Sequence, residues 1–375
     1  MTPLVGAGYQ PADADERGLW QAFDKLEDAI SHSNLLVKDG NVNEYVRGVL
    51  ERLLGNKAAD VRPYVVRNPD FNASMAPNGL MIIHTGLLAR MRNEAQFAAV
   101  VGHESGHYLR RHSVRSWRDT KTKTAVMSVI SLAGAAASGA TGNNWYDIAN
   151  SINTTLLMSL FQFSRDMESE ADAYGLRLMH DTHYSTKAAS EVWAQLIEER
   201  KASAAARKKK YKDGSRSALS THPPSEERML DLAESARELD RFSSDEPPHH
   251  DRREEWLTAM ARMRPMLIEE QIRLNDSGAS LYLLNSLAQD GWDGSLRYFE
   301  GEAYRLRDEE GDAARATEAY AASVRFPDTL PEAYRAHGYA LLKSGNAEDG
   351  KRSLKKYLEL RPDAPDAAMV KFSLE

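Results

Sequence analysis

Residues 101–108 read VGHESGHY, and this stretch decides how the rest of the chain is interpreted. On a helix, His103 and His107 lie one turn apart on the same face, so both imidazoles can reach one zinc ion at about 2.0–2.1 Å. Glu104 is the next residue along and can act on a water molecule at that metal as the general base. The pattern carries this meaning only on a helix, and Asn93 is expected to cap one that extends to about His112. The alternative is a pair of surface histidines on a charged helix.

A second segment, residues 164–175 (SRDMESEADAYG), supplies the third ligand that a catalytic zinc site requires. Glu168 and Asp172 share one helical face, so Glu168 can bind the metal while Asp172 accepts a hydrogen bond from a ligating imidazole. Gly175, on the same face, is expected to let two helices approach closely. Glu170 points nearly opposite to Glu168 and is the alternative ligand. An ordinary acidic helix is the competing interpretation of the segment.

His112 follows His107 by five residues. On a continuous helix it is turned away from the face that His103 and His107 share. We therefore expect it to pack or to support the site rather than to bind the metal.

Three further stretches place these segments in a known family: residues 72–88 with their NASMAPNG and TGLL motifs, residues 93–95, and residues 221–228 (THPPSEER). Over roughly residues 72–228 the chain resembles the zinc metallopeptidase family that includes HtpX and the CAAX prenyl endopeptidases. The resemblance implies a gluzincin-like peptidase domain with one Zn²⁺ per chain, which lowers the pKa of a bound water to about 7. His222 and Arg228 are then candidates to stabilise the oxyanion. His222 has a second candidate role, which is to occupy the open zinc position and keep the enzyme latent.

The composition and the apolar stretches limit the kinds of partner and the cell locations that fit the chain. With 48 basic and 55 acidic residues among 375, the chain has no global positive field to attract nucleic acid. It contains no cysteine, so a zinc ion must be held by nitrogen and oxygen. Residues 1–17 do not have the pattern of a signal peptide, and the family's transmembrane helices have no counterpart. The most apolar stretch, residues 125–140, is too short to span a bilayer and is expected to be a buried helix or to make peripheral membrane contact.

The regular elements predict a mainly α fold with a small β-sheet. Residues 61–66 and 79–84 are strand-like, and a substrate in extended form is expected along 79–84 as an edge strand. Residues 1–245 are expected to form the zinc metallopeptidase domain, because the stretch 243–251 (SSDEPPHHD) is polar and rich in proline. Residues 252–375 are expected to form an all-α, tetratricopeptide-like domain.

The C-terminal part repeats itself with a period of 34 residues, which separates Gly311 from Gly345 and is typical of tetratricopeptide repeats. The second unit is clear, and the first, with Ala303 as its small helical residue, requires a one-residue shift. Such arrays bind protein segments in a concave groove.

Together with the family resemblance, the repeats are typical of its soluble bacterial periplasmic branch, which acts in outer-membrane protein quality control. The chain is thus expected to cleave unfolded or misassembled proteins, and its repeats to bind outer-membrane assembly machinery. The competing hypothesis is a chaperone or adaptor that binds clients through the repeats, with a latent metal site.

Overall fold

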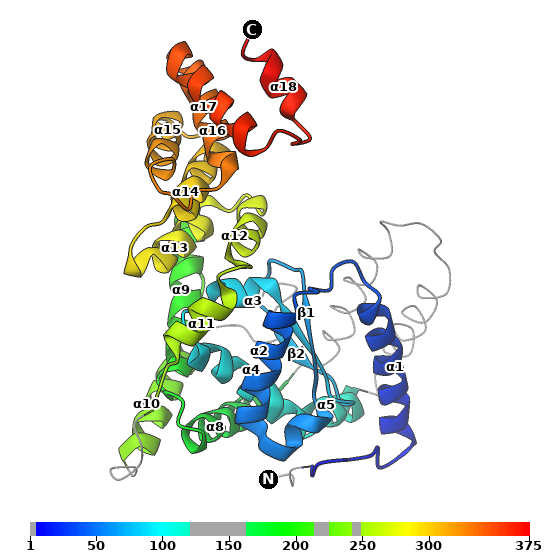
Figure 1. The fold of residues 1–375 in the computed structure, drawn as a ribbon. Helices are drawn as coiled ribbons and strands as arrows, with labels where there is room; N and C mark the ends of the chain where they lie inside the picture. Colours follow the sequence, from blue (N-terminus) through cyan, green and yellow to red (C-terminus); the bar gives the residue numbers. More distant parts are fainter. Residues whose placement is uncertain (1–4, 121–162, 214–224, 242–248) are drawn as a thin grey trace. The chain divides into compact units, whose positions relative to one another are not determined.

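The computed structural model describes residues 5–120, 163–213, 225–241 and 249–375. The chain divides into two compact units, Met1–Ile197 with Lys212–Arg262, and Glu198–Tyr211 with Met263–Glu375. The expected fold class is confirmed, since the described chain is mainly helical and contains one three-stranded sheet (Figure 1).

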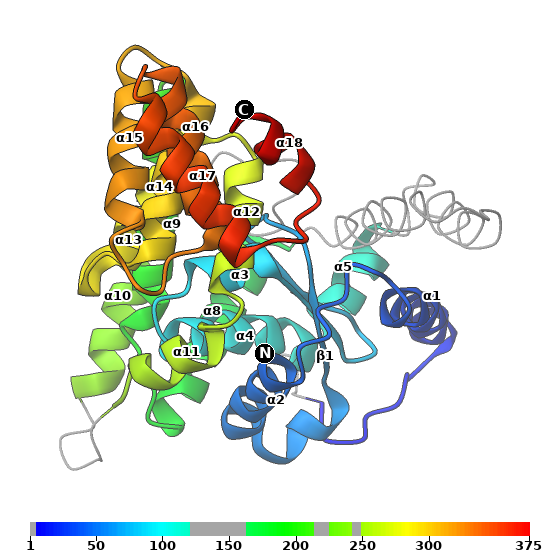
Figure 2. The same ribbon diagram turned by 45° about the horizontal axis from the view of Figure 1, so that its top comes forward.

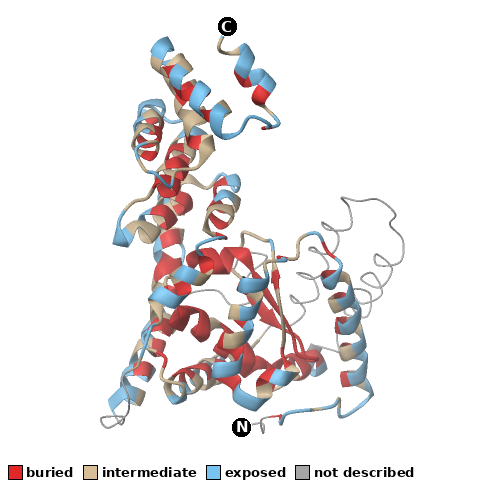
Figure 3. Ribbon diagram, in the orientation of Figure 1, coloured by how far each residue is buried: buried red, intermediate tan, exposed pale blue. Residues whose placement is uncertain are grey.

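The first unit surrounds its sheet with helices. Its elements in chain order are α1 (Ala14–Ser31), α2 (Gly40–Leu54), η1 (Gly55–Asp60), β1 (Arg62–Val66), β2 (Ala73–Met75), β3 (Leu80–His84), α3 (Thr85–Arg90), α4 (Glu94–Leu109), α5 (His112–Thr120), α8 (Arg165–Asp181), α9 (Ala188–Ala206), α10 (Glu226–Arg241) and α11 (Arg253–Met260). Helix α9 continues into the second unit, because residues from Glu198 onward belong there. Figure 3 shows that β3 and α4 are buried almost throughout.

The strand order is β1-β3-β2, so β3 is the central strand. It pairs in parallel with β1 and antiparallel with β2. The expectation that residues 79–84 form an edge strand is therefore wrong. The order along the chain does not determine the order in the sheet, and β1 and the shorter β2 occupy its two edges.

Helices α4 and α8 pack against each other where small residues face small residues. A Cβ added at Gly106 would lie 3.0 Å from Ala171 Cα, and one added at Gly175 would lie 3.0 Å from the backbone nitrogen of His103. Side chains at these positions would therefore push the helices apart. The close approach predicted for Gly175 is confirmed.

The first turn of α4 is fixed by a buried carboxylate. Glu94 is 1 % exposed and accepts hydrogen bonds from the hydroxyls of Tyr45 and Tyr184 and from Arg52. Trp256, from α11, also covers this end, and its indole Nε1 donates to the carbonyl oxygen of Met91 at 3.0 Å. The helix that carries the HExxH motif thus begins at a point held by segments far apart in the sequence.

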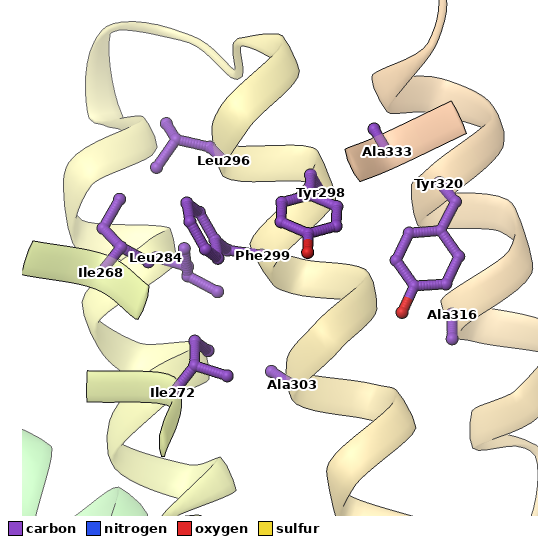
Figure 4. Packing of buried hydrophobic residues seen from close by; sticks show 10 residues of the cluster. All are labelled: Ile268, Ile272, Leu284, Leu296, Tyr298, Phe299, Ala303, Ala316, Tyr320 and Ala333. Atoms are coloured by element: carbon purple, nitrogen blue, oxygen red, sulfur yellow. The ribbon is translucent and has the colours of Figure 1, made fainter. Parts of the chain in front are cut away.

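The second unit is entirely helical. Besides the end of α9 it contains α12 (Arg264–Arg273), α13 (Ser277–Leu287), η2 (Ala288–Asp290), α14 (Gly294–Arg307), α15 (Asp312–Ser323), α16 (Pro331–Lys343), α17 (Ala347–Leu360) and α18 (Ala367–Phe372). Helices α14 and α15 pack as one hairpin and α16 and α17 as another, and α15 packs on α16 (Figure 2). Its core is an apolar cluster that includes Phe299 from α14 and Tyr320 from α15 (Figure 4).

In each hairpin a glycine of the first helix lies under a large side chain of the second. A Cβ at Gly301 would meet the ring of Tyr320 at 2.3 Å, whereas one at Gly338 would meet Leu354 at 2.7 Å. Gly301 and Tyr320 are separated by 19 residues and Gly338 and Leu354 by 16, a difference of nearly one helical turn. Gly301 therefore lies under the ring of Tyr320 in the first hairpin, and the one-residue shift at Ala303 stays a prediction.

The apolar stretch at residues 125–140 lies outside the described residues. Within the described ranges, none of the helices has the length and apolar character that crossing a membrane requires.

Candidate metal centre

The two histidines of the motif face each other on α4. Asn93 caps this helix as predicted, because its side chain accepts a hydrogen bond from the backbone of Gln96 at 2.8 Å. His103 Nε2 and His107 Nε2 lie 3.0 Å apart, and both residues are buried. Two imidazole nitrogens are thus held close together in a site with little access to water.

Helix α8 brings the carboxylate of Glu168 to the same point. Glu168 Oε2 lies 3.6 Å from His103 Nε2, and Glu168 Oε1 lies 3.6 Å from His107 Nε2. One ligand atom from each of the three residues lies within 4.8 Å of the others. Ligands at about 2.0–2.1 Å from a tetrahedral zinc ion lie about 3.3 Å from one another. The spacing and the set of two nitrogens and one oxygen therefore fit a zinc ion.

Asp172 holds the outer nitrogen of His103. Its Oδ1 lies 2.8 Å from His103 Nδ1, so the ring donates there and leaves Nε2 bare toward Glu168. Burial alone would raise the pKa of the Asp172 carboxyl, but the charges of Arg228 and His103 and the hydrogen bonds from them hold it below the usual value. The carboxylate is therefore ionised and fixes the tautomer of His103.

Arg228, from α10, is paired with two acids of α8, Glu168 and Asp172. It donates to Asp172 from Nε at 2.8 Å and from Nη2 at 2.7 Å, and its Nη1 lies 3.0 Å from Glu168 Oε2. The guanidinium also lies over the ring of Trp193, 4.3 Å from the centroid. Burial lowers the pKa of Arg228, but the nearby carboxylates outweigh it, so the group stays charged. Arg228 thus holds Glu168 and Asp172 in place as well as bringing positive charge to the site.

Glu104 is 3 % exposed and lines a pocket of about 600 Å³, a volume that includes its open mouth. His103, Asp172 and Arg228 line the same pocket. The remaining lining residues are mostly apolar and come from five segments: Phe71, Asn72, Ala73, Ala99, Val100, Gly175, Leu176, Met179, Ala189, Val192, Trp193 and Leu232. The candidate base therefore stands at the polar end of a largely apolar cavity.

His112 lies beside the site because the motif helix ends earlier than the sequence indicates. Helix α4 stops at Leu109, Arg111 has a φ of 56°, and α5 begins at His112. This left-handed residue turns the chain back, so His112 Nδ1 lies 2.9 Å from His107 Nδ1. His112 therefore supports His107 from its outer side, in line with the expectation that it does not bind the metal, but it does so from a second helix and not from a continuation of α4.

Glu170, the alternative ligand, contacts His112 and lies outside the group of His103, His107 and Glu168. Its Oε2 lies 3.0 Å from His112 Nε2 and 3.3 Å from Arg115 Nη1. The hydrogen bond from His112 lowers the pKa of the Glu170 carboxyl, whereas burial lowers the pKa of the His112 imidazole. Helical periodicity separated Glu170 from Glu168 correctly but gave no sign of this contact.

His222, the candidate for the oxyanion or for closing the metal site, lies outside the described residues.

The fold and the site define a class of protein, in which a HExxH helix and an acidic helix meet over a metal-binding triad. The model of peptidase family M48 matches residues 40–236, slightly more than half of the chain, and the chain belongs to this family.

Named relatives resemble parts of the chain. The mitochondrial metalloendopeptidase OMA1 of Schizosaccharomyces pombe is 32% identical over 40% of this chain and 43% of its own length. The beta-barrel assembly-enhancing protease of Escherichia coli is 21% identical over 54% of this chain and 41% of its own. Metalloprotease YcaL of Escherichia coli is 30% identical over 48% of this chain and 64% of its own. The chain thus spans less than half the length of the first two of these relatives.

Proposed function

We propose that the chain is a zinc-dependent endopeptidase that hydrolyses unfolded or misassembled proteins. The observation that carries this proposal is the meeting of His103, His107 and Glu168, whose ligand atoms lie within 4.8 Å of one another. Membership of a peptidase family supports it.

Each side chain of the centre has a distinct task in this proposal. His103, His107 and Glu168 hold the zinc ion, which supplies Lewis acidity that polarises the scissile carbonyl and makes water more acidic. Glu104 takes a proton from the attacking water and passes it to the leaving amine. Its burial keeps bulk water from competing for that proton.

The main chain of the substrate pairs with β2 rather than with β3. The backbone N–H of His84 donates to the carbonyl oxygen of Asn72, and that of Ala76 donates to the carbonyl oxygen of Leu80. Hydrogen-bonded pairs alternate with non-hydrogen-bonded pairs along an antiparallel ladder, so the hydrogen-bonded pair between these two is Ser74 with Ile82. The N–H and C=O groups of Ala73 and Met75 consequently point away from β3, to the edge of β2 that carries no further strand among the described residues. Pairing with this edge binds many sequences, because it uses backbone atoms alone.

The pocket beside Glu104 gives this cleavage an apolar preference. Met179 and Val192 are fully buried at its wall, and Ala73 connects it to the edge of β2. A substrate side chain that enters it replaces water with apolar contacts, which stabilises binding by about 25 cal/mol per Å² buried. Aliphatic and aromatic residues, which unfolded proteins expose, are the side chains that fit.

Arg228 and His222 complete the catalytic set. Arg228 keeps the acids of α8 in position and is also a candidate to stabilise the oxyanion, together with His222. His222 keeps its second candidate role as the group that closes the metal site in a latent state.

The same proposal places the enzyme in the bacterial periplasm, in association with the outer membrane. A relative named for the enhancement of beta-barrel assembly supports this location and the assembly machinery as a partner. The helical hairpins of the second unit, proposed to be tetratricopeptide-like, would contact that machinery or hold substrates.

These hairpins also favour the competing function, which is client binding by a chaperone or adaptor without hydrolysis. Replacement of Glu104 by Gln in the full-length protein separates the two functions, because it removes the base and keeps the shape. We expect hydrolysis of an unfolded outer-membrane β-barrel protein to fall at least 100-fold, as measured by loss of intact substrate on gels. Glu198→Gln, at an exposed position of α9, is the matched control. Hydrolysis that persists unchanged in Glu104→Gln would show that this site does not carry out the cleavage, and a wild type that binds the substrate without cleaving it would support the competing function.

The ligand assignment has its own experiment. Zinc content after purification should be close to one ion per chain in the wild type and strongly reduced in Glu168→Ala. Full occupancy in that variant would show that another residue is the third ligand.

A further inference from the structure

The two metal-facing imidazoles are supported in different ways. His103 turns its outer nitrogen toward a carboxylate, Asp172, at 2.8 Å. His107 turns its outer nitrogen toward another imidazole, His112, and the carboxylate of Glu170 lies beyond it at 3.0 Å. In the second arrangement an additional imidazole lies between the histidine and the carboxylate, and nothing in the HExxH pattern requires it.

We propose that His112 and Glu170 act as positioning residues that hold His107 in the tautomer and orientation needed to bind the metal; this rests on the metal centre proposed above. Because His107 must present a bare Nε2 to the ion, its proton resides on Nδ1 and is donated to His112 Nδ1. His112 then carries its own proton on Nε2 and donates it to Glu170 Oε2. Each hydrogen bond in this chain has one donor and one acceptor, and every group is in its ordinary form: two neutral imidazoles and one carboxylate.

The surroundings restrict both rings to this arrangement. His112 is completely buried, and Phe163 stacks on His107 with ring centroids 3.9 Å apart and an angle of 26°. Arg115 lies 3.3 Å from the Glu170 oxygen that accepts from His112, which keeps this carboxylate charged. The ring of His107 is thus held on its face by an aromatic side chain and at its edge by a hydrogen bond.

The simpler account is that His112 only fills space between α4, α5 and α8. Replacement by Asn and by Leu separates the two accounts, because these side chains have nearly the same shape. Asn offers an oxygen at the position of the imidazole Nδ1 and can still accept from His107, whereas Leu cannot. A packing role predicts that His112→Leu binds zinc at least as tightly as His112→Asn. A positioning role predicts that His112→Asn binds zinc more tightly.

The measurement is the zinc dissociation constant of the full-length protein, obtained by competition with a chromophoric chelator. We expect His112→Leu to weaken zinc binding by about 10- to 100-fold and His112→Asn by clearly less. Thermal unfolding of the metal-free proteins, followed by circular dichroism, shows whether each variant folds. Equal zinc affinity in the Leu and Asn variants overturns the proposal.

Glu170→Gln provides a second test that leaves the buried imidazole in place. It removes the charge that orients His112, and we expect zinc binding to weaken by about tenfold, at the lower end of such effects. Asp181→Asn, an exposed acid in the last turn of α8, is the matched control and should bind zinc like the wild type. An unchanged affinity in Glu170→Gln refutes the role of the chain of hydrogen bonds. Failure of the wild type to bind zinc would instead refute the metal centre itself, and this proposal with it.

Discussion

Replacement of Gly175 by Ala tests whether direct backbone contact sets the distance between α4 and α8. The added Cβ would lie 3.0 Å from the nitrogen of His103 and 3.3 Å from its Cα. Ordinary contacts of this kind are about 3.5–4.0 Å, so the helices must separate by about 0.5 Å. That displacement moves Glu168 away from the histidines by an amount comparable with the tolerance of a functional site, which is about 0.5 Å.

The expected free energies follow from two opposing effects. Overpacking costs about 1–3 kcal/mol, whereas the change from Gly to Ala inside a helix stabilises by about 1 kcal/mol. Gly48→Ala in α2 is the control, because its Cβ would meet nothing closer than Arg52 Nη1 at 3.8 Å. The two variants should therefore differ by about 1–3 kcal/mol in the free energy of unfolding.

Urea unfolding of the metal-free protein measures this difference, and chelator competition measures zinc affinity. We expect Gly175→Ala to be less stable than Gly48→Ala and to bind zinc more weakly than the wild type. If both variants gain the same stability and bind zinc alike, the backbone contact does not set the geometry of the site.

Three other predictions concern separate parts of the chain. Burial lowers the pKa of His84 to about 4, so the unfolded chain, with a usual histidine pKa of about 6.5, takes up a proton first. Stability should therefore fall by up to about 3 kcal/mol as the pH drops from 6.5 to 4, and His84→Leu should show a shallower fall in melting temperature over that window. Asp312→Ala should destabilise the second unit by about 1.5–3 kcal/mol in urea unfolding, because the carboxylate is buried and accepts from Arg307 at 2.7 Å; an unchanged midpoint would contradict this. His222→Ala should raise peptidase activity if His222 closes the metal site and lower it if it stabilises the oxyanion; an unchanged rate would exclude both roles.

The sequence predicts those parts of the site that depend on helical periodicity. His103, His107, Glu168 and Asp172 stand at spacings that place them on single helical faces, and the structure brings all four together. The approach at Gly175 follows from the same periodicity.

Features that depend on where an element ends, or on its neighbour in space, could not be predicted in this way. The contact between His112 and His107 requires α4 to stop at Leu109, and a positive φ at Arg111 is not apparent from an Arg-Arg-His sequence. The central position of β3 depends on which strands pair with it, and local patterns contain no information on strand order. Arg228 likewise pairs with Glu168 and Asp172 on a helix distant in sequence, and a motif match does not predict which residues are its partners.

The indole of Trp256 affects how the protein matures during synthesis. It packs against Phe97, with ring centroids 5.4 Å apart, and closes the beginning of α4 from a position twenty residues beyond the end of the family match at residue 236. A ribosome must therefore translate α11 before the helix with the HExxH motif acquires its last apolar cover. Recombinant versions of the first unit should accordingly extend through α11 to Arg262, because a product that ends before Trp256 loses this contact with Phe97.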